Sequence, residues 1–370
     1  MNNRILRPAA EELYKKELDA LENFYTESKP ANWRLSPRAV RDFIIGRNEP
    51  IEFNGEKIEI KKKFYGDDAL IERCIVTLAG NRGLMLVGEP GTAKSMLSEL
   101  LSAAISGDSS NTIQGTAGTT EDMVKYSWNY AMLLSNGPSR KSLIASPLMK
   151  GMEVGSLARV EEITRCPSEI QDSLISIMSD KVLNIPELGN EGVVYAKPGF
   201  NVIATANIRD KGVNDMSSAL KRRFNFETVF PVSNISLEME IIEKESEKYL
   251  KDNNIDMTVD KSAAEILAVT FHELREGISS DGARIEKMDA VMSTAEAVSV
   301  YIQTALGAYY YGDGKITMDR VVQNVMGAVV KENREDVGKL KNYFSSVIKD
   351  RSKKEGEAWK EYYNAKSWIK

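Results

Sequence analysis

Gly88-Glu89-Pro90-Gly91-Thr92-Ala93-Lys94-Ser95 is the stretch of this sequence that decides its fold. Leu84-Met85-Leu86-Val87 precedes it and has the composition of a short buried strand, and the apolar residues that follow it recur at helical spacing. A strand, a loop of small residues and a helix in this order direct backbone N–H groups and the positive end of a helix at one point. The stretch therefore predicts a binding site for a polyphosphate.

We expect two side chains of this loop to contact a bound nucleotide and its metal ion. Lys94 is expected to meet the β- and γ-phosphates of a nucleotide, and the Ser95 hydroxyl is expected to hold Mg²⁺. The pattern G-x-x-x-x-G-K-[ST] is met except at its second glycine, which is Ala93. We expect the backbone at Ala93 to avoid positive φ, which alanine disfavours. A chance glycine turn is the alternative, and the strand and helix on either side make it the weaker interpretation.

The composition limits the chemistry that is open to the chain. Its 370 residues are 42% hydrophobic and 28% charged, enough for one large or two ordinary globular domains. Lys and Arg number 49 against 54 Asp and Glu, so the formal charge of −5 does not favour nucleic acid or an anionic membrane. Two cysteines and one histidine exclude a disulfide framework, a Cys/His metal cluster and an ordinary Ser-His-Asp triad. The chemistry must use carboxylates, lysine and arginine.

The sequence predicts a soluble cytoplasmic protein. Its N-terminus lacks the apolar core of a signal peptide. The longest uncharged run, residues 297–312, is shorter than the roughly 20 residues of a membrane span.

Residues 1–63 are predicted to form an extension before the nucleotide domain. An apolar stripe predicts a helix over about residues 9–27, and Asn54-Gly55 between alternating apolar residues predicts a hairpin over residues 51–60. Lys61-Lys62-Lys63 is expected to be a solvated loop rather than a phosphate contact. Another apolar stripe predicts a helix over residues 67–79, so the nucleotide domain is expected to span residues 64–232.

Beyond the phosphate loop, a segment opening at Thr119-Thr120-Glu121-Asp122 has the hydroxyl and acidic residues of a helix N-terminus. We expect the aromatic and apolar residues along it to belong to the core; they are Trp128, Tyr130, Leu133 and Leu134. The Gly, Pro and Ser content of residues 135–146 predicts a loop.

Two carboxylates follow the predicted strand at residues 157–160. A phosphate-loop ATPase needs acids here to hold metal and to activate water. Glu162 is the candidate for polarising the attacking water, and Glu161 occupies the metal-holding position, where Asp is usual. Arg159 makes the strand a poor apolar one, and on these residues alone an exposed acidic strand end is an equal interpretation. If the strand ending at Asn207 lies beside this one, Asn207 can bond the γ-phosphate or the water.

At the paired arginines Arg222 and Arg223 the chain resembles a known family, the MoxR branch of the AAA+ ATPases. Five motifs carry the resemblance, in order: Walker A at 88–95, Walker B with its following arginine at 160–165, a hairpin at 182–195, sensor 1 at Ala204-Thr205-Ala206-Asn207, and the arginine-finger segment at Leu220-Lys221-Arg222-Arg223-Phe224. The resemblance covers about residues 64–284. It implies an α/β fold, a P-loop AAA+ three-layer αβα nucleotide-binding domain with a C-terminal all-α lid.

The resemblance also implies roles for three arginines. Arg284, in Ser279-Ser280-Asp281-Gly282-Ala283-Arg284, matches the sensor 2 arginine that reaches the γ-phosphate from the lid, here residues 233–330. Arg223, or failing that Arg222, is expected to serve the active site of the next subunit; the alternative is that both cap a helix C-terminus. The charged segment 331–370 either docks a partner or covers the lid.

The function implied by the resemblance is Mg²⁺-dependent ATP hydrolysis in a ring, commonly hexameric, that remodels a protein partner, often beside a protein with a von Willebrand A domain. Two further interpretations stay open. Glu161 in place of Asp suggests a slowly hydrolysing nucleotide switch or scaffold. A nucleic-acid motor or a GTPase with the same loop is disfavoured by the acidic charge balance.

Overall fold

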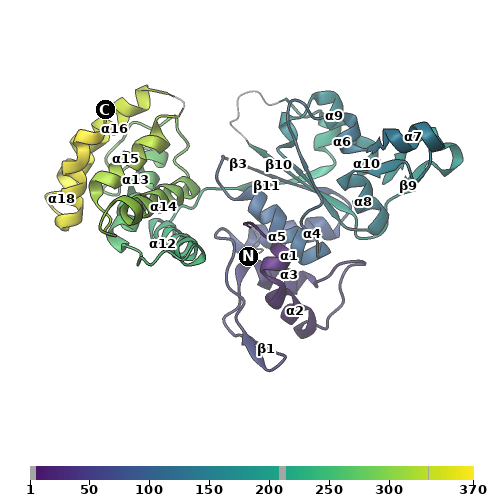
Figure 1. The fold of residues 1–370 in the computed structure, drawn as a ribbon, viewed down its shortest axis with the longest axis horizontal. Helices are drawn as coiled ribbons and strands as arrows, with labels where there is room; N and C mark the ends of the chain where they lie inside the picture. The colour runs from purple at the N-terminus through teal and green to yellow at the C-terminus, as the bar shows by residue number, and fades with distance from the viewer. Residues whose placement is uncertain (1–5, 208–213, 332) are drawn as a thin grey trace. The chain divides into compact units, whose positions relative to one another are not determined.

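The structure is a computed structural model that describes residues 6–207, 214–331 and 333–370 (Figure 1). The chain divides into two compact units. The first is formed by residues up to 88 together with 93–229, and the second by residues 89–92 together with 230–370.

A parallel five-stranded sheet forms the centre of the first unit. Its strands are ordered β11 (Phe224–Val229), β3 (Gly83–Gly88), β10 (Asn201–Asn207), β7 (Leu157–Glu161) and β4 (Thr112–Gln114). Gly88 lies opposite Asn207, and Gln114 lies opposite Glu161. Because all neighbouring strands are parallel, their carboxyl ends meet at one edge of the sheet. The order confirms that β7 and β10 are adjacent.

Helices cover both faces of this sheet, and successive strand residues point to opposite sides. Leu84 and Leu86 share a core with α4 (Asp68–Ala79) and α5 (Lys94–Ser106). Met85 belongs instead to a second core, with α8 (Pro147–Val154) and α10 (Leu174–Ser179). The two cores and the sheet between them make the three-layer αβα arrangement that the resemblance implies (Figure 1).

The N-terminal residues pack against the α4–α5 face. They form α1 (Ala10–Leu13), α2 (Lys15–Phe24), α3 (Pro37–Ile45) and a hairpin of β1 (Ile51–Phe53) and β2 (Glu56–Ile58). The hairpin prediction is confirmed, with Asn54 and Gly55 both at positive φ in the turn. The single helix predicted over residues 9–27 is in fact two, with a break at Tyr14.

The prediction of a solvated lysine triplet is wrong at Lys63. Its ammonium group is buried and lies 2.5 Å from a Glu17 carboxylate oxygen. It also donates to the carbonyl oxygens of Phe43 and Lys61, both at 2.9 Å. A buried lysine is tolerated here because its charge is paired and its donors are used.

The helix predicted to begin at Thr119-Thr120-Glu121-Asp122 is confirmed as α6 (Glu121–Val124), with Thr120 at its N-cap, but it ends after four residues. The chain then forms β5 (Tyr126–Trp128), α7 (Tyr130–Asn136) and β6 (Leu143–Ala145), with β5 and β6 paired antiparallel, and the expectation that the apolar residues here belong to the core is wrong at two positions. Asn129 caps α7 through its side chain, and Gly137 ends it. Tyr130 is 69% and Leu134 is 89% exposed, so neither belongs to the core. A second hairpin, β8 (Val182–Asn184) and β9 (Val193–Tyr195), confirms the hairpin predicted at 182–195.

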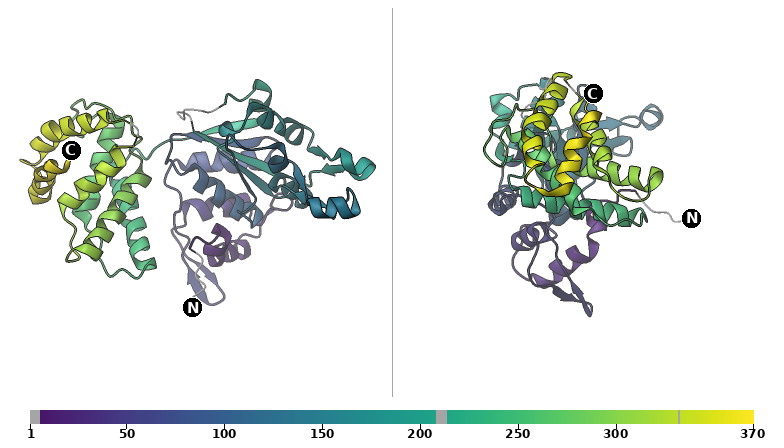
Figure 2. Two further views of the ribbon diagram at one scale, coloured as in Figure 1. Left: turned by 45° about the horizontal axis from the view of Figure 1, so that its top comes forward. Right: turned by 90° about the vertical axis from the view of Figure 1, so that its left-hand side faces the viewer.

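The second unit is helical, as expected. Its main helices are α12 (Ile235–Asp252), α13 (Lys261–Glu276), α14 (Thr294–Tyr311), α15 (Met318–Val329), α16 (Glu335–Tyr343), α17 (Lys349–Arg351) and α18 (Gly356–Asn364) (Figure 2). Residues of α16 and α18 lie in the same hydrophobic core as α13, α14 and α15. In the part of the chain that the structure describes, no helix combines the length and the apolar character needed to cross a membrane.

Candidate functional site

The loop between β3 and α5 contains a left-handed residue that is not glycine. Ala93 has a φ of 63° and a ψ of 23° and stands immediately before Lys94, the first residue of α5. The expectation that Ala93 avoids positive φ is therefore wrong. The left-handed conformation costs a non-glycine residue about 1–2 kcal/mol. The tight turn from strand to helix imposes it, and alanine has the smallest side chain that can accept it.

This loop has the features of a phosphate site. α5 is 13 residues long, and its N-cap residue Ala93 has no side-chain oxygen with which to cap the first turn, so the positive end of the helix opens on the loop. Lys94 is only 6% exposed, and its ammonium group donates to the Gly88 carbonyl oxygen at 3.2 Å. The lysine side chain thus folds back over the loop, where a polyphosphate would lie.

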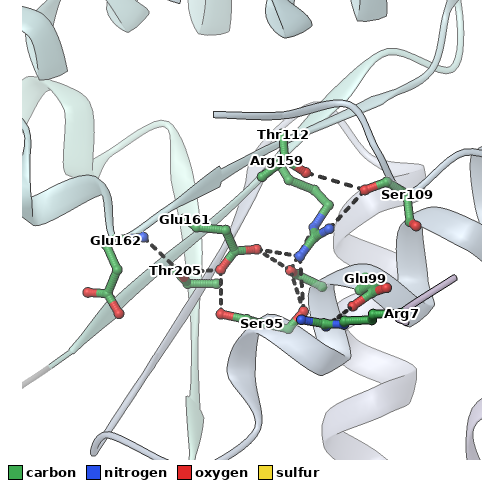
Figure 3. A network of polar contacts seen from close by, with 10 residues as sticks. Arg7, Ser95, Glu99, Ser109, Thr112, Arg159, Glu161, Glu162 and Thr205 are labelled. Carbon is green, nitrogen blue, oxygen red and sulfur yellow. Dashed lines mark hydrogen bonds and ion pairs between the residues drawn. The ribbon is translucent and has the colours of Figure 1, made fainter. Parts of the chain in front are cut away.

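Glu161, the last residue of β7, is buried among hydrogen-bond donors (Figure 3). One carboxylate oxygen accepts from the hydroxyls of Ser95 and Thr205, each at 2.7 Å. The other accepts from Ser98 at 2.5 Å and from the Arg159 guanidinium at 2.8 Å. Burial opposes the charged form of Glu161, but the bonds from Ser95 and Ser98 and the nearby Arg159 outweigh it and hold the pKa of its carboxyl below the usual value.

Arg159 is a charged residue in a buried strand, and the hydrogen bonds of its guanidinium account for its place there. Besides Glu161, its guanidinium donates to the Ser98 hydroxyl at 2.9 Å and to the backbone oxygens of Ser109 and Ser95 at 2.9 and 3.1 Å. Every residue of β7 is buried, including Glu161, so the strand does not end in an exposed acid. Arg159 balances the Glu161 charge and ties β7 to the first turns of α5.

The oxygen atoms around Ser95 suit a magnesium ion. The Ser95 hydroxyl and the Glu161 carboxylate are directly bonded, and hard oxygen ligands are those that Mg²⁺ prefers. In this arrangement the Glu161 oxygens are already bonded to protein donors. A metal held by Ser95 would replace the Ser95–Glu161 hydrogen bond or contact Glu161 through water.

Glu162 follows β7 in a strained conformation, with a φ of 54°. Its backbone N–H donates to the Thr205 hydroxyl at 3.0 Å, and its carboxylate accepts from the Asn207 side-chain amide at 2.8 Å. Arg165 lies 3.7 Å from the same carboxylate. The structure thus brings Glu162 and Asn207 together at the carboxyl edge of the sheet, and the strained turn aims the carboxylate out of the strand direction.

Arg222 and Arg223 follow α11 (Ser218–Lys221) and differ in their contacts. Arg223 donates to the Ser179 hydroxyl at 2.7 Å and to the Ala219 carbonyl oxygen at 2.6 Å, so its guanidinium is engaged within its own chain. Arg222 is exposed. In the second unit, Arg284 is also exposed, and its backbone pairs with Ile278 in an isolated antiparallel bridge.

The sequence alone assigned no role to three residues that surround the carboxylates: Thr205, Ser98 and Gly115. Thr205 touches both Glu161 and the Glu162 backbone, and Ser98 bonds Glu161. A Cβ on Gly115 would lie 2.4 Å from the Glu162 carbonyl oxygen, so only glycine fits there. Spacing could have indicated two of them: Thr205 precedes Asn207 by two strand positions, and Ser98 follows Ser95 by three helical positions, so each shares a face with a predicted site residue.

Two family models match separate parts of this chain. Residues 83–224 match the model of the AAA domain (dynein-related subfamily), and residues 236–370 match that of the YehL-like AAA+ ATPase C-terminal domain. The Escherichia coli (strain K12) protein YehL is 45% identical over 369 residues, which are 99% of this chain and 98% of that protein. Chaperone MoxR1 of Mycobacterium tuberculosis (strain ATCC 25618 / H37Rv) is 28% identical over 170 residues, 45% of this chain and 41% of that protein.

A solved structure, NtrX from Brucella abortus in complex with ADP, aligns with 83% of this chain and 63% of its own, at 11% identity and a TM-score of 0.48. The fold and the family matches define an AAA+ ATPase-type protein that is homologous to MoxR chaperones. Within that class, the chain belongs to the YehL-like AAA+ ATPase family.

Proposed function

We propose that this protein binds ATP with Mg²⁺ and hydrolyses it to ADP and phosphate. The observation that carries the proposal is that the phosphate loop, Glu161 at the end of β7 with the adjacent Glu162, and Asn207 of β10 meet at one edge of a parallel sheet. Open α/β sheets bind their ligands at this edge. The proposal also follows from membership of an AAA+ ATPase family.

Each residue of the site has a proposed role that follows from its position. Residues 88–95 and the positive end of α5 hold the phosphates, with Lys94 as the main cationic contact. Ser95, with Glu161 behind it, holds Mg²⁺, which neutralises charge on the phosphates when it is bound. Glu162 polarises the attacking water, and Asn207 fixes the direction of that carboxylate through the 2.8 Å hydrogen bond. For Arg284, the resemblance to MoxR-type ATPases implies a role at the γ-phosphate, and this role stays a prediction.

We further propose that hydrolysis takes place in a ring, hexameric as is common for such ATPases, and remodels a protein partner. Arg223 or Arg222 then completes the site of the next subunit. The homologue's name, Chaperone MoxR1, supports a protein partner, and so does the first unit's exposed apolar surface. Tyr130 and Leu134 are four residues apart on α7, hence on one face, and both are largely exposed. A von Willebrand A domain protein as that partner, and a cytoplasmic location, stay predictions.

A slowly hydrolysing switch is the second candidate, and one observation favours it. Arg159 and the three hydroxyls occupy the Glu161 carboxylate, which leaves it less free to hold Mg²⁺ than an acid without such partners. The rate of ATP turnover by the purified full chain with Mg²⁺ distinguishes the two candidates: sustained turnover favours the ATPase, and tight binding with little turnover favours the switch.

The Lys94→Ala variant tests the site itself. We expect tight ATP binding to be abolished while the fold is kept, because Lys94 supplies the main positive charge to the phosphates. Calorimetric titration with ATP measures the affinity, and circular dichroism checks the fold. Lys197→Ala, at an exposed lysine away from the loop, is the matched control. Unchanged affinity in Lys94→Ala would contradict the phosphate-loop assignment.

A further inference from the structure

The outer side of β11 is an open edge of the five-stranded sheet. β11 stands first in the strand order and pairs with β3, and among the residues that the structure describes no strand pairs with its other side. The strand at the opposite edge, β4, is three residues long, whereas β11 has six. Very short edge strands, prolines and lysines keep natural sheet edges from pairing with another chain. β11 is longer and contains neither proline nor lysine, so its edge is able to pair.

One hydrogen bond to β3 shows which backbone groups of β11 face outward. The Gly83 N–H donates to the Arg223 carbonyl oxygen at 2.9 Å, so the backbone of Arg223 is directed at β3. Successive residues of an extended strand direct their N–H and C=O groups alternately to its two sides. The backbone donors and acceptors of Phe224, Phe226 and Thr228 therefore point away from the sheet. Another extended backbone is the partner that matches these groups.

The side chains of β11 add an apolar and a charged feature to this edge. Phe226 is 45% exposed, although Phe224, on the same face of the strand, is buried in the core. Asn225 and Glu227 lie on the other face, where Glu227 pairs with Arg73 of α4 at 3.0 Å. The edge thus presents a half-exposed aromatic ring between an amide and a carboxylate.

A hollow of about 670 Å³ lies beside this edge, between α4 and β11. Val76 of α4 lines the hollow and is 71% exposed. Its other lining residues on α4 include Glu72 and Arg73, which are paired with Arg41 and Glu227. The hollow therefore offers apolar surface without an uncompensated charge that would oppose the approach of another chain.

A second copy of this chain matches the edge in one antiparallel register. With a two-fold axis at Phe226, the two Phe226 backbones bond each other and Phe224 bonds Thr228 of the other copy, so every outward residue is used. An axis at Asn225 leaves Thr228 without a strand partner, and an axis at Glu227 leaves Phe224 without one. The axis at Glu227 also sets two carboxylates opposite each other, which is destabilising, whereas the axis at Phe226 sets Glu227 opposite Asn225.

We propose that β11 is a self-association surface, at which two copies of the chain join their sheets antiparallel across a two-fold axis at Phe226. The contact involves the first unit alone and no nucleotide, so it goes beyond the proposed function. Two-fold contacts are the commonest between identical chains. Pairing the two Phe226 rings and covering Val76 removes apolar surface from water, and the open backbone groups gain partners.

Thr228→Pro tests the hydrogen bonds of the edge. Proline removes the outward N–H at this position and leaves the bonds to β3 intact, as at other edge strands. Sedimentation velocity on the full chain without nucleotide, over a range of concentrations, measures the mass of the assembly. We expect the wild type to associate and Thr228→Pro to halve the mass. Thr228→Val keeps the N–H, so this matched control should associate as the wild type does, and thermal unfolding checks that each variant is folded.

Two substitutions at Asn225 test the register. Asn225→Lys sets opposite charges across from Glu227 at two symmetric places, so it should tighten the association about twofold to thirtyfold. Asn225→Glu sets like charges there and should weaken the association by a similar factor. Both variants lose the same hydrogen bond from the Asn225 amide to the Thr77 hydroxyl, so the loss of that bond alone would move both in one direction.

Three results would overturn the inference: a wild-type chain that is monomeric at every concentration, a folded Thr228→Pro with the mass of the wild type, or a shift of both Asn225 variants in the same direction. If Thr228→Pro does not fold, the Asn225 pair still decides. Because no nucleotide is present, these results leave the proposed ATPase site unaffected. Lys94→Ala should associate as the wild type does.

Discussion

At the scale of single residues, the neighbouring glutamates at the end of β7, Glu161 and Glu162, have different surroundings. Glu161 faces inward and is bonded to donors on β7, β10 and α5. Glu162 leaves the strand at positive φ, and its carboxylate meets Asn207. A carboxylate engaged on both oxygens suits a supporting role toward a metal, whereas the Glu162 carboxylate, oriented by the Asn207 amide at the edge of the sheet, is placed to polarise water.

The first prediction follows from this difference. Glu162→Gln should bind ATP as tightly as the wild type and fail to hydrolyse it, because water activation is needed for turnover and not for binding. Glu161→Gln should instead weaken the Mg²⁺ dependence of binding. Phosphate release measures turnover, and calorimetry with and without Mg²⁺ measures binding. If Glu161→Gln stops turnover and Glu162→Gln does not, the two roles are exchanged.

The second prediction concerns the buried pair of Arg159 and Glu161, whose side chains are 9% and 5% exposed. Arg159→Met leaves the Glu161 charge without its cation, and removing one partner of a buried pair costs about 3–5 kcal/mol. We expect the lower end of that range, because three hydroxyls still bond Glu161. Adding Glu161→Gln should recover part of the loss. Urea unfolding measures each free energy.

Arg140→Met is the control for this experiment. Arg140 pairs with Glu153 at 3.2 Å, and both side chains are 41% exposed. Exposed pairs contribute about 0–1 kcal/mol, so this variant should be nearly as stable as the wild type. Equal losses of unfolding free energy in Arg159→Met and Arg140→Met would show that the buried ion pair stabilises the fold no more than the exposed one.

Single residues also mark the limit of what the sequence predicts. The residue types of the phosphate loop were enough to expect a strand, loop and helix, because each element has its own apolar period. The conformation of Ala93 was predicted wrongly. Intrinsic preference disfavours left-handed alanine, and the closure of the loop between a fixed strand and a fixed helix overrides it.

At the scale of elements, the buried strands were predictable and the projecting segment was not. β3 and β10 read as apolar runs bounded by the loop residues that follow them. The segment from β5 to β6 also contains aromatic and apolar residues, yet it extends from the sheet and leaves Tyr130 and Leu134 exposed. Periodicity identifies an apolar face and cannot say whether that face is covered.

The third prediction concerns the acid stability of the helical unit. Burial disfavours the charge on Glu273 of α13, but hydrogen bonds from Arg351, Tyr343 and Ser280 outweigh it and lower the pKa of its carboxyl in the folded state. The unfolded chain therefore binds the proton more readily. The resulting stabilisation is fully present above the unfolded value of about 4.3 and is lost as the pH falls from there through the lower folded value. We expect unfolding free energies of the wild type to be flat near neutrality and to fall below about pH 4.

A variant isolates the contribution of Glu273 to this fall. Glu273→Gln cannot titrate, so its stability should be lower near neutrality and should change less between pH 5 and 3, a range chosen around the usual carboxyl pKa of about 4.3. Tyr362→Phe serves as the control, because Tyr362 is buried in the same core, its hydroxyl pairs with Thr270, and a tyrosine does not titrate between pH 5 and 3. Parallel acid profiles for wild type and Glu273→Gln would contradict the prediction.

At the scale of the whole molecule, the proposed ring gives a reason for the two arginines after α11. The transferring phosphoryl group carries more negative charge than Lys94 and Mg²⁺ offset, and an arginine supplied there raises the rate by about 10³–10⁵. Arg223 is bonded to Ser179 and Ala219 in its own chain, while the adjacent Arg222 is exposed. These contacts favour Arg222 as the residue that reaches the next subunit, with Arg223 holding the segment in place.

The last prediction tests whether the site is shared between subunits. An Arg222→Ala/Arg223→Ala double variant keeps Glu162 and lacks the arginines, and a Glu162→Gln variant keeps the arginines and lacks the carboxylate. Each should be inactive alone. In a ring with head-to-tail interfaces, random mixing of equal amounts makes about a quarter of the interfaces complete, so we expect about a quarter of wild-type turnover. Native mass spectrometry must show that both subunits enter the same assembly.

The single variants then decide between the arginines. Arg222→Ala should lose turnover without loss of melting temperature and should be rescued by mixing, because an exposed side chain contributes little to the fold. Arg223→Ala should lower the melting temperature, because its bonds to Ser179 and Ala219 are lost. If mixed assemblies stay inactive, each arginine serves only its own chain, where positive charge at the end of a helix is worth up to about 1 kcal/mol.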